Sequence, residues 1–165
     1  MVSKIGALIS RAAALLTRAE GLPILLARVV LGVGFTLTGY GKLFKNHSGV
    51  VDFFTSLGIP MPALNAWFIG GLEFFGGMLL VVGLGTRGVA FLLSCTMLVA
   101  TLTSTLPDLH KKGEGILDAL LTTEILAFVM LLWLVFSGPG PFSLDRLVAK
   151  KVAPPSTSPG PKPGA

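Results

Sequence analysis

The sequence predicts an all-α fold, a four-transmembrane-helix bundle preceded by an N-terminal amphipathic interfacial helix. Two properties of the composition indicate a membrane protein: 52% of the 165 residues are hydrophobic and only 13% are charged, and the mean hydropathy is +0.81. Such values lie outside the usual range of soluble domains. No alternation typical of strands is visible, and helices satisfy their own backbone hydrogen bonds in lipid. We therefore expect a helical membrane domain over residues 21–146.

Residues 1–20 have the pattern of an amphipathic helix lying on the membrane surface. Their apolar residues recur at helical spacing, and Lys4, Arg11 and Arg18 follow one another along another face. Such a helix buries its apolar face among the lipid headgroups. A cleaved signal peptide is the alternative, but Arg11 interrupts any apolar core and no small-residue cleavage site follows.

Four apolar runs are long enough to cross a bilayer, which takes about 20 residues of helix. We place these spans at residues 22–44, 63–84, 88–106 and 115–136. Pro23 and Pro62 suit helix starts, whereas Pro107 is predicted to end the third span because proline disrupts a helix interior. The short turn between the second and third spans predicts an antiparallel hairpin.

The segment after the fourth span is basic. Ser143 is predicted to cap a short basic interfacial helix in "SLDRLVAKKV", and residues 147–165 as a whole are predicted to be a basic, proline-rich disordered tail. Eight lysines and arginines fall on the side of the termini and four on the other side. Because positive charge favours the cytoplasmic side, both termini are predicted to be cytoplasmic.

Glu73, in "GGLEFFGG", is an acid in the middle of the second span. Placing a charge at the bilayer centre costs about 2.5–3.5 kcal/mol, so such an acid is usually buried, paired or protonated. Glu73 shares one helical face with small residues, Ala66, Gly70 and Gly77. The first span offers a matching face, made of Arg28, Gly32, Phe35, Gly39 and Lys42. We expect these two faces to pack together, because small residues let membrane helices approach closely.

Depth in the bilayer indicates which charges could meet. Glu73 and Glu124 lie at similar depth when residues are counted from the outer edge at the helical rise. The Lys42 side chain leans into the membrane, so Lys42 is the better candidate partner for these acids. Asp118, near the outer edge, is also within range of Lys42. Arg28 leans toward the cytoplasm, so it either joins this polar pocket or extends to the headgroups.

Two interpretations of the glutamates remain open. In one, Glu73 and Glu124 are neutral buried carboxyls that only fix the helix register, hydrogen-bonded to Thr36, Thr38, Thr122 or Thr123. In the other, both acids and Lys42 line a polar cavity that binds, or exchanges protons with, a small polar head such as a quinone.

Other chemistries are disfavoured. Cys95 is the single cysteine, which excludes an internal disulfide and a CxxC pair. His47 and His110 lie in predicted loops without a third ligand, so no metal site is expected. The net charge of +5 belongs to segments that flank apolar runs, which favours anionic lipid over nucleic acid as the partner.

The stretches "RVVLGVGFTLTGYGKLF", "FFTSLGIPMPALNAWFIGGLEFFGGMLLVVGLGTRGVAFLL" and "GPGPFSLD" resemble the DoxX family of small four-helix bacterial membrane proteins. The resemblance covers roughly residues 22–146. It rests mainly on Arg28, the Gly41-Lys42 step, the "LGIP" loop, the Glu73 motif and the "GTR" turn. The N-terminal helix and the proline-rich tail look like additions to the family core.

The resemblance implies a bacterial inner (plasma) membrane location and an association with quinone-linked oxidoreductases. It assigns Glu73, Lys42 and Arg28 to a polar pocket, to which the depth of Glu124 in the bilayer adds a second acid. A quinone-interacting or accessory subunit of a membrane oxidoreductase complex is the resulting expectation, with catalytic activity of the chain itself left open. The alternative is a non-enzymatic scaffold or small-solute carrier. Self-association into a homo-oligomer is a further expectation, because small-residue faces remain available.

Overall fold

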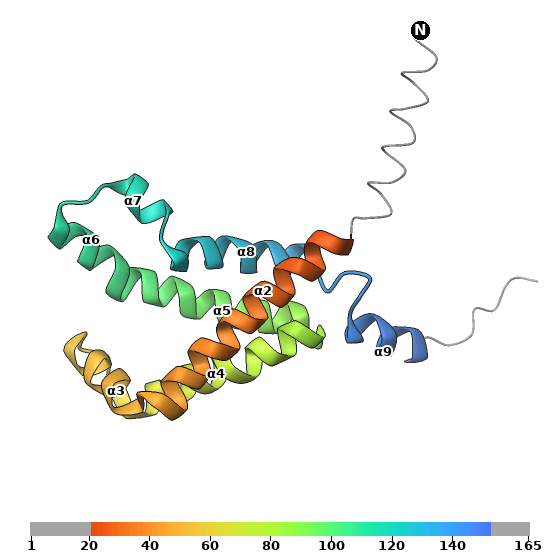
Figure 1. Ribbon diagram of the computed structural model, residues 1–165, viewed down its shortest axis with the longest axis horizontal. Coiled ribbons are helices and arrows are strands. Elements are labelled where there is room, and N and C mark those ends of the chain that lie inside the picture. The colour runs from red at the N-terminus through yellow and green to blue at the C-terminus, as the bar shows by residue number, and fades with distance from the viewer. Residues whose placement is uncertain (1–20, 153–165) are drawn as a thin grey trace, which may run out of the picture.

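Helices make up all the regular structure of residues 21–152, the part of the chain that the computed structural model describes (Figure 1). The predicted amphipathic helix at residues 1–20 and the tail from residue 153 onward lie outside this part. The helices are α2 (Gly21–Tyr40), α3 (His47–Ser56), α4 (Pro62–Val82), α5 (Thr86–Ala100), α6 (Leu106–Lys112), α7 (Ile116–Leu120), α8 (Thr123–Ser137) and α9 (Leu144–Val152), with π-helical segments η1 (Gly41–Lys45) and η2 (Thr101–Thr105).

Three continuous helical runs in this part are long and apolar enough to cross a membrane. They comprise Gly21–Lys45, Pro62–Val82 and Thr86–Lys112. The first two agree closely with the predicted spans at residues 22–44 and 63–84. The fourth apolar helix, Thr123–Ser137, is shorter than the others.

The predicted fourth span at residues 115–136 is wrong as a single helix. It is divided into α7 and α8 at Leu121 and Thr122, where Thr122 has an extended backbone with φ −68° and ψ 147°. The Thr122 hydroxyl donates a hydrogen bond to the Ala119 carbonyl at 2.8 Å. Threonine thereby offers the backbone a local alternative to the helical hydrogen bond, which favours a helix boundary.

The predicted end of the third span at Pro107 is also wrong, since the helix continues to Lys112. The π-helical segment η2 lies directly before this proline. A π turn shifts the hydrogen-bond register by one residue, and this change beside Pro107 accommodates its missing N–H group.

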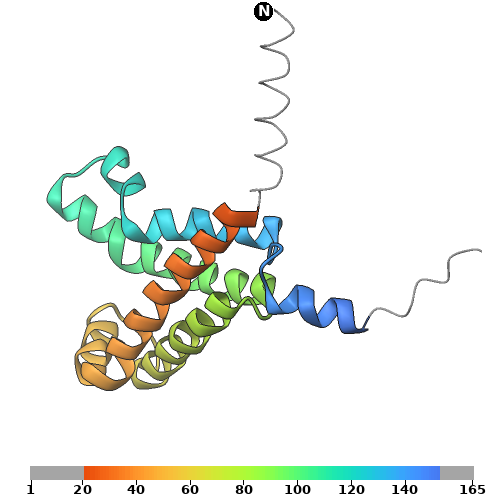
Figure 2. The ribbon, with the colours of Figure 1, turned by 45° about the vertical axis from the view of Figure 1, so that its right-hand side comes forward.

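The helices form two pairs that meet at one end of the molecule. α2 packs along α4, and α5 packs along α8. The pairs meet near the α4–α5 turn and diverge toward α3, α6 and α7 (Figures 1 and 2). A buried leucine-rich core joins the pairs, formed chiefly by Leu31, Leu80, Leu93, Leu131 and Leu134. The short turn between the second and third predicted spans is present, but α4 and α5 diverge from it, and each packs chiefly against another helix (Figure 1).

Glycines bring α2 and α4 together along the two faces that the sequence predicts to pack. Gly32 and Gly39 are buried on α2, and Gly70 and Gly77 on α4. A Cβ atom at Gly77 would lie 2.5 Å from the Thr36 nitrogen. This close backbone approach confirms the predicted pairing of the faces and brings the polar side chains of the two helices together.

The C-terminal helix α9 begins where the sequence predicts a short basic helix. Ser143 precedes it, and the Ser143 hydroxyl accepts a hydrogen bond from the Arg146 N–H at 3.3 Å, as an N-cap does. Helical structure reaches Val152, so residues 147–152 are not the disordered tail that the sequence predicts. The helix projects from the bundle near the α4–α5 turn (Figure 2).

Candidate functional site

A cavity of about 600 Å³ lies between the two helix pairs. It is lined by α2, η1, α3, α4, α5, η2 and α8, and its walls are mainly apolar. Its apolar lining includes the side chains of Phe35, Phe53, Phe54, Ile69 and Met97. Three charged residues also line it: Lys42, Glu73 and Glu124. Such a mixture of apolar walls and few polar groups is typical of small-molecule sites.

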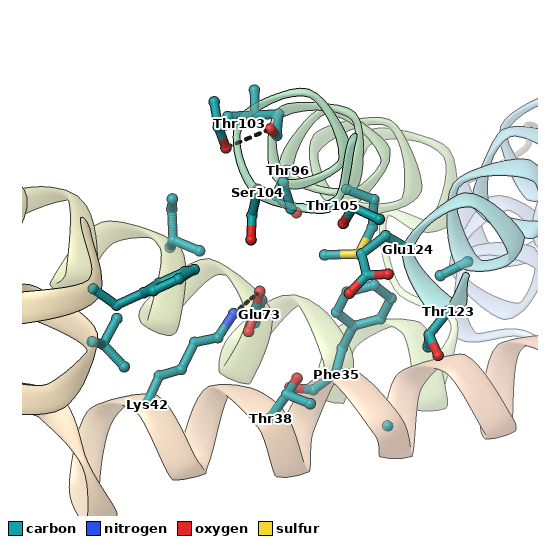
Figure 3. A pocket seen from close by; sticks show the side chains of 18 of the residues that line it. Phe35, Thr38, Lys42, Glu73, Thr96, Thr103, Ser104, Thr105, Thr123 and Glu124 are labelled. Atoms are coloured by element: carbon teal, nitrogen blue, oxygen red, sulfur yellow. Dashed lines mark hydrogen bonds and ion pairs between the residues drawn. The ribbon is translucent and has the colours of Figure 1, made fainter. Parts of the chain in front are cut away.

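Lys42 and Glu73 form an ion pair inside this cavity (Figure 3). The distance from Lys42 Nζ to Glu73 Oε1 is 2.5 Å, and the Glu73 side chain is only 1% exposed. The other carboxylate oxygen, Oε2, is buried and has no hydrogen-bond partner among the described residues. The structure therefore pairs Glu73 with the lysine predicted from the sequence, and leaves its other carboxylate oxygen unpaired among the described residues.

Glu124 reaches the same cavity from the opposite helix pair (Figure 3). It lies in the first turn of α8, directly after the break at Thr122. The ion pairs within residues 21–152 are Lys42–Glu73 and Lys112–Asp108, so Glu124 is left without a cation there. The break between α7 and α8 thus places an acid at a helix start facing the cavity.

Three of the threonines that could have bonded to the glutamates, Thr36, Thr38 and Thr122, donate to backbone carbonyls instead. Thr36 and Thr38 donate to carbonyls of their own helix, those of Gly32 and Phe35. The buried carboxyl of Glu73 is paired with a lysine, which distinguishes it from a carboxyl held only by threonine hydroxyls.

Two features of the cavity are not predicted from the sequence. One is helix α3, which falls between predicted spans and contributes Val50, Phe53 and Phe54. The other is η2, whose Ser104 and Thr105 side chains face the space between the two glutamates (Figure 3). The run "TLTST" before a proline is the signal that could have indicated a polar helix surface there. Both π-helical segments border the cavity, a position where π turns are often found in functional sites.

Asp118 does not belong to the cavity. Its carboxylate accepts a hydrogen bond from the Gly115 N–H at 2.9 Å and so caps the start of α7. In the described part of the chain, no three histidine, cysteine, aspartate or glutamate side chains are close enough to share a metal ion.

Arg28 also lies away from the cavity, at the end where the helix pairs meet. It is 1% exposed, so the prediction that it could extend to the headgroups is wrong. Its Nε and Nη2 donate to the carbonyls of Leu80 and Val81 at the end of α4, each at 3.1 Å. Its Nη1 donates to the carbonyls of Pro139 and Phe142. Arg28 therefore joins α2, α4 and the segment after α8.

Asp145, in the first turn of α9, binds the C-terminal part of the chain to the α4–α5 turn. Its carboxylate accepts hydrogen bonds from the N–H groups of Gly85, at 2.7 Å, and Thr86, at 3.0 Å. Burial by itself raises the pKa of Asp145, whereas these hydrogen bonds and the charge of Arg28 lower it. The lowering effects together are larger, so the pKa lies below the ordinary value of 3.8.

This lowered pKa predicts that Asp145 contributes to the acid sensitivity of the fold. Because the carboxylate is favoured in the folded state, its contribution is complete above about pH 5. It is lost as the pH falls through 3.8 toward the lower pKa of the folded protein. We expect Asp145→Asn to lower Tm at neutral pH and to lose less Tm than the wild type between about pH 5 and about pH 3.

Thermal unfolding in detergent at a series of pH values measures this effect. Asp52→Asn is the matched control, since Asp52 is an exposed acid on α3. The control should follow the wild type at every pH. An equal loss of Tm in the wild type and Asp145→Asn would contradict the assigned role.

Comparisons with known proteins agree on one family. The family model DoxX matches residues 23–106. The inner membrane protein YqjF of Escherichia coli is 30% identical over 134 residues, which cover 80% of this chain and 96% of that protein. The inner membrane protein YphA of Escherichia coli is 30% identical over 126 residues, 74% of this chain and 88% of that protein. The putative oxidoreductase CatD of Bacillus subtilis is 38% identical over 79 residues, 48% of this chain and 57% of that protein. No solved structure matches the chain significantly.

Proposed function

The chain belongs to the DoxX family of membrane proteins, and we propose that it is a quinone-interacting or accessory subunit of a membrane oxidoreductase complex. The proposal includes a location in the bacterial inner membrane with both termini in the cytoplasm, as the distribution of lysine and arginine favours. The names of two relatives support the inner-membrane location, and the name of CatD, a putative oxidoreductase, supports the link to redox chemistry.

One observation carries the proposal: Glu73, a residue that lines an apolar cavity, has a buried carboxylate oxygen, Oε2, without a partner among the described residues. Leaving a buried polar atom unpaired costs about 1–3 kcal/mol, and more for a charged group. A ligand hydroxyl that donates to Oε2 would remove this cost. The cavity volume of about 600 Å³ is within the usual range of ligand sites, roughly 300–1,000 Å³.

The ion pair has the groups needed to bind both redox forms of a quinone. Lys42 Nζ can donate to a ring carbonyl, and Glu73 Oε2 can accept from the hydroxyl of the reduced ring. Reduction of a quinone takes up two electrons and two protons. The electrons would come from a partner dehydrogenase with a flavin or haem, while Lys42 and Glu73 bind the ring oxygen and exchange its proton.

The first test is whether quinone accompanies the protein and depends on Glu73. Gentle purification from the native membrane, followed by mass spectrometry of extracted small molecules and co-purifying proteins, should find a quinone or an oxidoreductase subunit in stoichiometric amount. Glu73→Gln should lower the quinone content about tenfold, because the charged acceptor is lost.

Glu114→Gln is the matched control, since Glu114 is exposed in the loop between α6 and α7. It should retain the quinone content of the wild type. Wild-type protein that carries only lipids and no oxidoreductase subunit would reject the proposal and favour a scaffold or solute carrier. Equal quinone content in Glu73→Gln and wild type would show that the quinone binds somewhere other than this cavity.

A further inference from the structure

The second acid of the cavity, Glu124, has surroundings that suit a ligand oxygen. The first hydrogen bond within α8 is donated by Leu126 to the Thr122 carbonyl, so the N–H groups before Leu126 have no helical acceptor. The first turn of α8 therefore carries partial positive charge. Glu124 is in that turn, lines the cavity and has no cation among the described residues.

Hydroxyl groups of η2 add donors beside this acid. Thr101 and Thr103 donate to carbonyls of their own helix, those of Met97 and Val99. Ser104 and Thr105 make no such bond in the described structure, and they line the cavity. Figure 3 shows both side chains directed into the space between Glu73 and Glu124. Their hydroxyls can donate to a carbonyl or accept from a hydroxyl.

The cavity therefore has two polar stations. The first station consists of Lys42 and Glu73, with one donor and one free acceptor. The second station consists of Glu124, Ser104 and Thr105, again with donors and an acceptor. The stations belong to opposite helix pairs, and apolar side chains such as Phe35 form the walls between them (Figure 3).

We infer that the cavity binds a flat ring bearing oxygen atoms at opposite ends, a para-quinone or para-hydroquinone, with one oxygen at each station. The inference rests on the proposed function and adds the position of the second oxygen and the residues that bind it. Each station holds a donor for a carbonyl and an acceptor for a hydroxyl, so both redox forms fit the same pair of stations. On this inference, a ring with a single oxygen, or with two adjacent oxygens, would satisfy only one station.

The test compares three reduced probes in lipid nanodiscs without oxygen, with Kd measured by isothermal titration calorimetry. The probes are a short-chain alkyl para-hydroquinone, the catechol isomer with adjacent hydroxyls, and the alkylphenol with one hydroxyl. Wild-type protein should bind the para-hydroquinone about tenfold more tightly than either other probe, because one hydrogen bond to a charged group is gained.

Variants identify the stations. Glu73→Gln and Glu124→Gln should each weaken para-hydroquinone binding about tenfold. Binding of the alkylphenol, which has one hydroxyl, should be weakened by only one of these variants or by neither. Glu114→Gln is the control and should leave every Kd unchanged. Unfolding temperatures equal to that of the wild type would show that the variants fold. If a variant does not fold, the comparison of the three probes on wild-type protein decides the question alone.

Equal affinity of the wild type for all three probes would overturn the inference while leaving quinone binding intact. Unchanged para-hydroquinone affinity in Glu124→Gln would do the same, because it removes the second station. If none of the three probes binds, the proposed function is rejected together with the inference.

Discussion

Replacing Arg28 with alanine is expected to destabilise the protein severely, by about 3–5 kcal/mol. The side chain is 1% exposed and donates hydrogen bonds to four carbonyls, two at the end of α4 and two in the segment after α8. Its removal leaves these carbonyls without their donor and also leaves a cavity between α2 and the C-terminal segment. Buried polar groups that lose a partner are costly because water does not replace it.

The position of Arg28 in the fold increases the effect. The Arg28 charge is near enough to lower the pKa of Asp145, so the alanine variant also leaves Asp145 without this cation. The α4–α5 turn and the segment after α8 are held together by these two residues. We therefore expect loss of folded protein from the membrane, or a much lower unfolding temperature in detergent.

Two variants make the Arg28 measurement specific. Arg28→Lys keeps the charge, but an ammonium group cannot donate to all four carbonyls as a guanidinium does. Its unfolding temperature should therefore lie between those of the wild type and Arg28→Ala. Arg146→Ala removes an exposed arginine from the same region and should be close to the wild type. A stable Arg28→Ala protein, with the unfolding temperature of Arg146→Ala, would show that the carbonyl contacts contribute little.

Gly77→Ala is expected to have the second largest effect on stability, a loss of about 1–3 kcal/mol from overpacking. The added Cβ would lie 2.5 Å from the Thr36 nitrogen and 2.6 Å from the Gly32 carbonyl oxygen. These are backbone atoms of the facing helix, which cannot rotate away as a flexible side chain could. To admit the methyl group, α2 and α4 must separate along the face that also holds Lys42 and Glu73.

Gly71→Ala is the matched control on the same helix. A Cβ atom at Gly71 would have no neighbour within 4 Å. Alanine is favoured over glycine in a helix by about 1 kcal/mol, so this variant should be as stable as the wild type or more stable. Thermal unfolding of both variants, measured side by side in the same detergent, compares the two sites. Equal stability of the two alanine variants would contradict a tight crossing at Gly77.

Much of the α2–α4 pair could be predicted from the sequence because its signals are local. The small residues around Glu73 and the matching glycines of the first span recur at helical spacing, and the depth of Lys42 follows from the helical rise. The structure confirms the packing of these faces and the contact between Lys42 and Glu73. Periodicity along each helix is sufficient for the faces, and the helical rise together with the direction in which helical side chains lean is sufficient for Lys42.

The remaining features depend on the backbone or on distant segments. The partners of Arg28 are carbonyls of α4 and of the segment after α8, and a carbonyl is present at every residue, so the sequence does not indicate which ones it will meet. The break at Thr122 and the continuation through Pro107 depend on backbone geometry that apolar composition does not reveal. For the same reason the sequence does not predict the hydroxyls of Ser104 and Thr105 as part of the site.

The pairing of Lys42 with Glu73 has a consequence for the charge selectivity of the cavity. The two formal charges cancel, and they remain balanced if a proton moves from the lysine to the carboxylate. Of the charged residues that line the cavity, Glu124 alone is then uncompensated within the described part of the chain. With Glu124 ionised, an anionic compound entering this apolar space would meet a negative charge that only the partial positive charge at the start of α8 offsets. Under the proposed function, we therefore expect the cavity to bind neutral molecules in preference to anions.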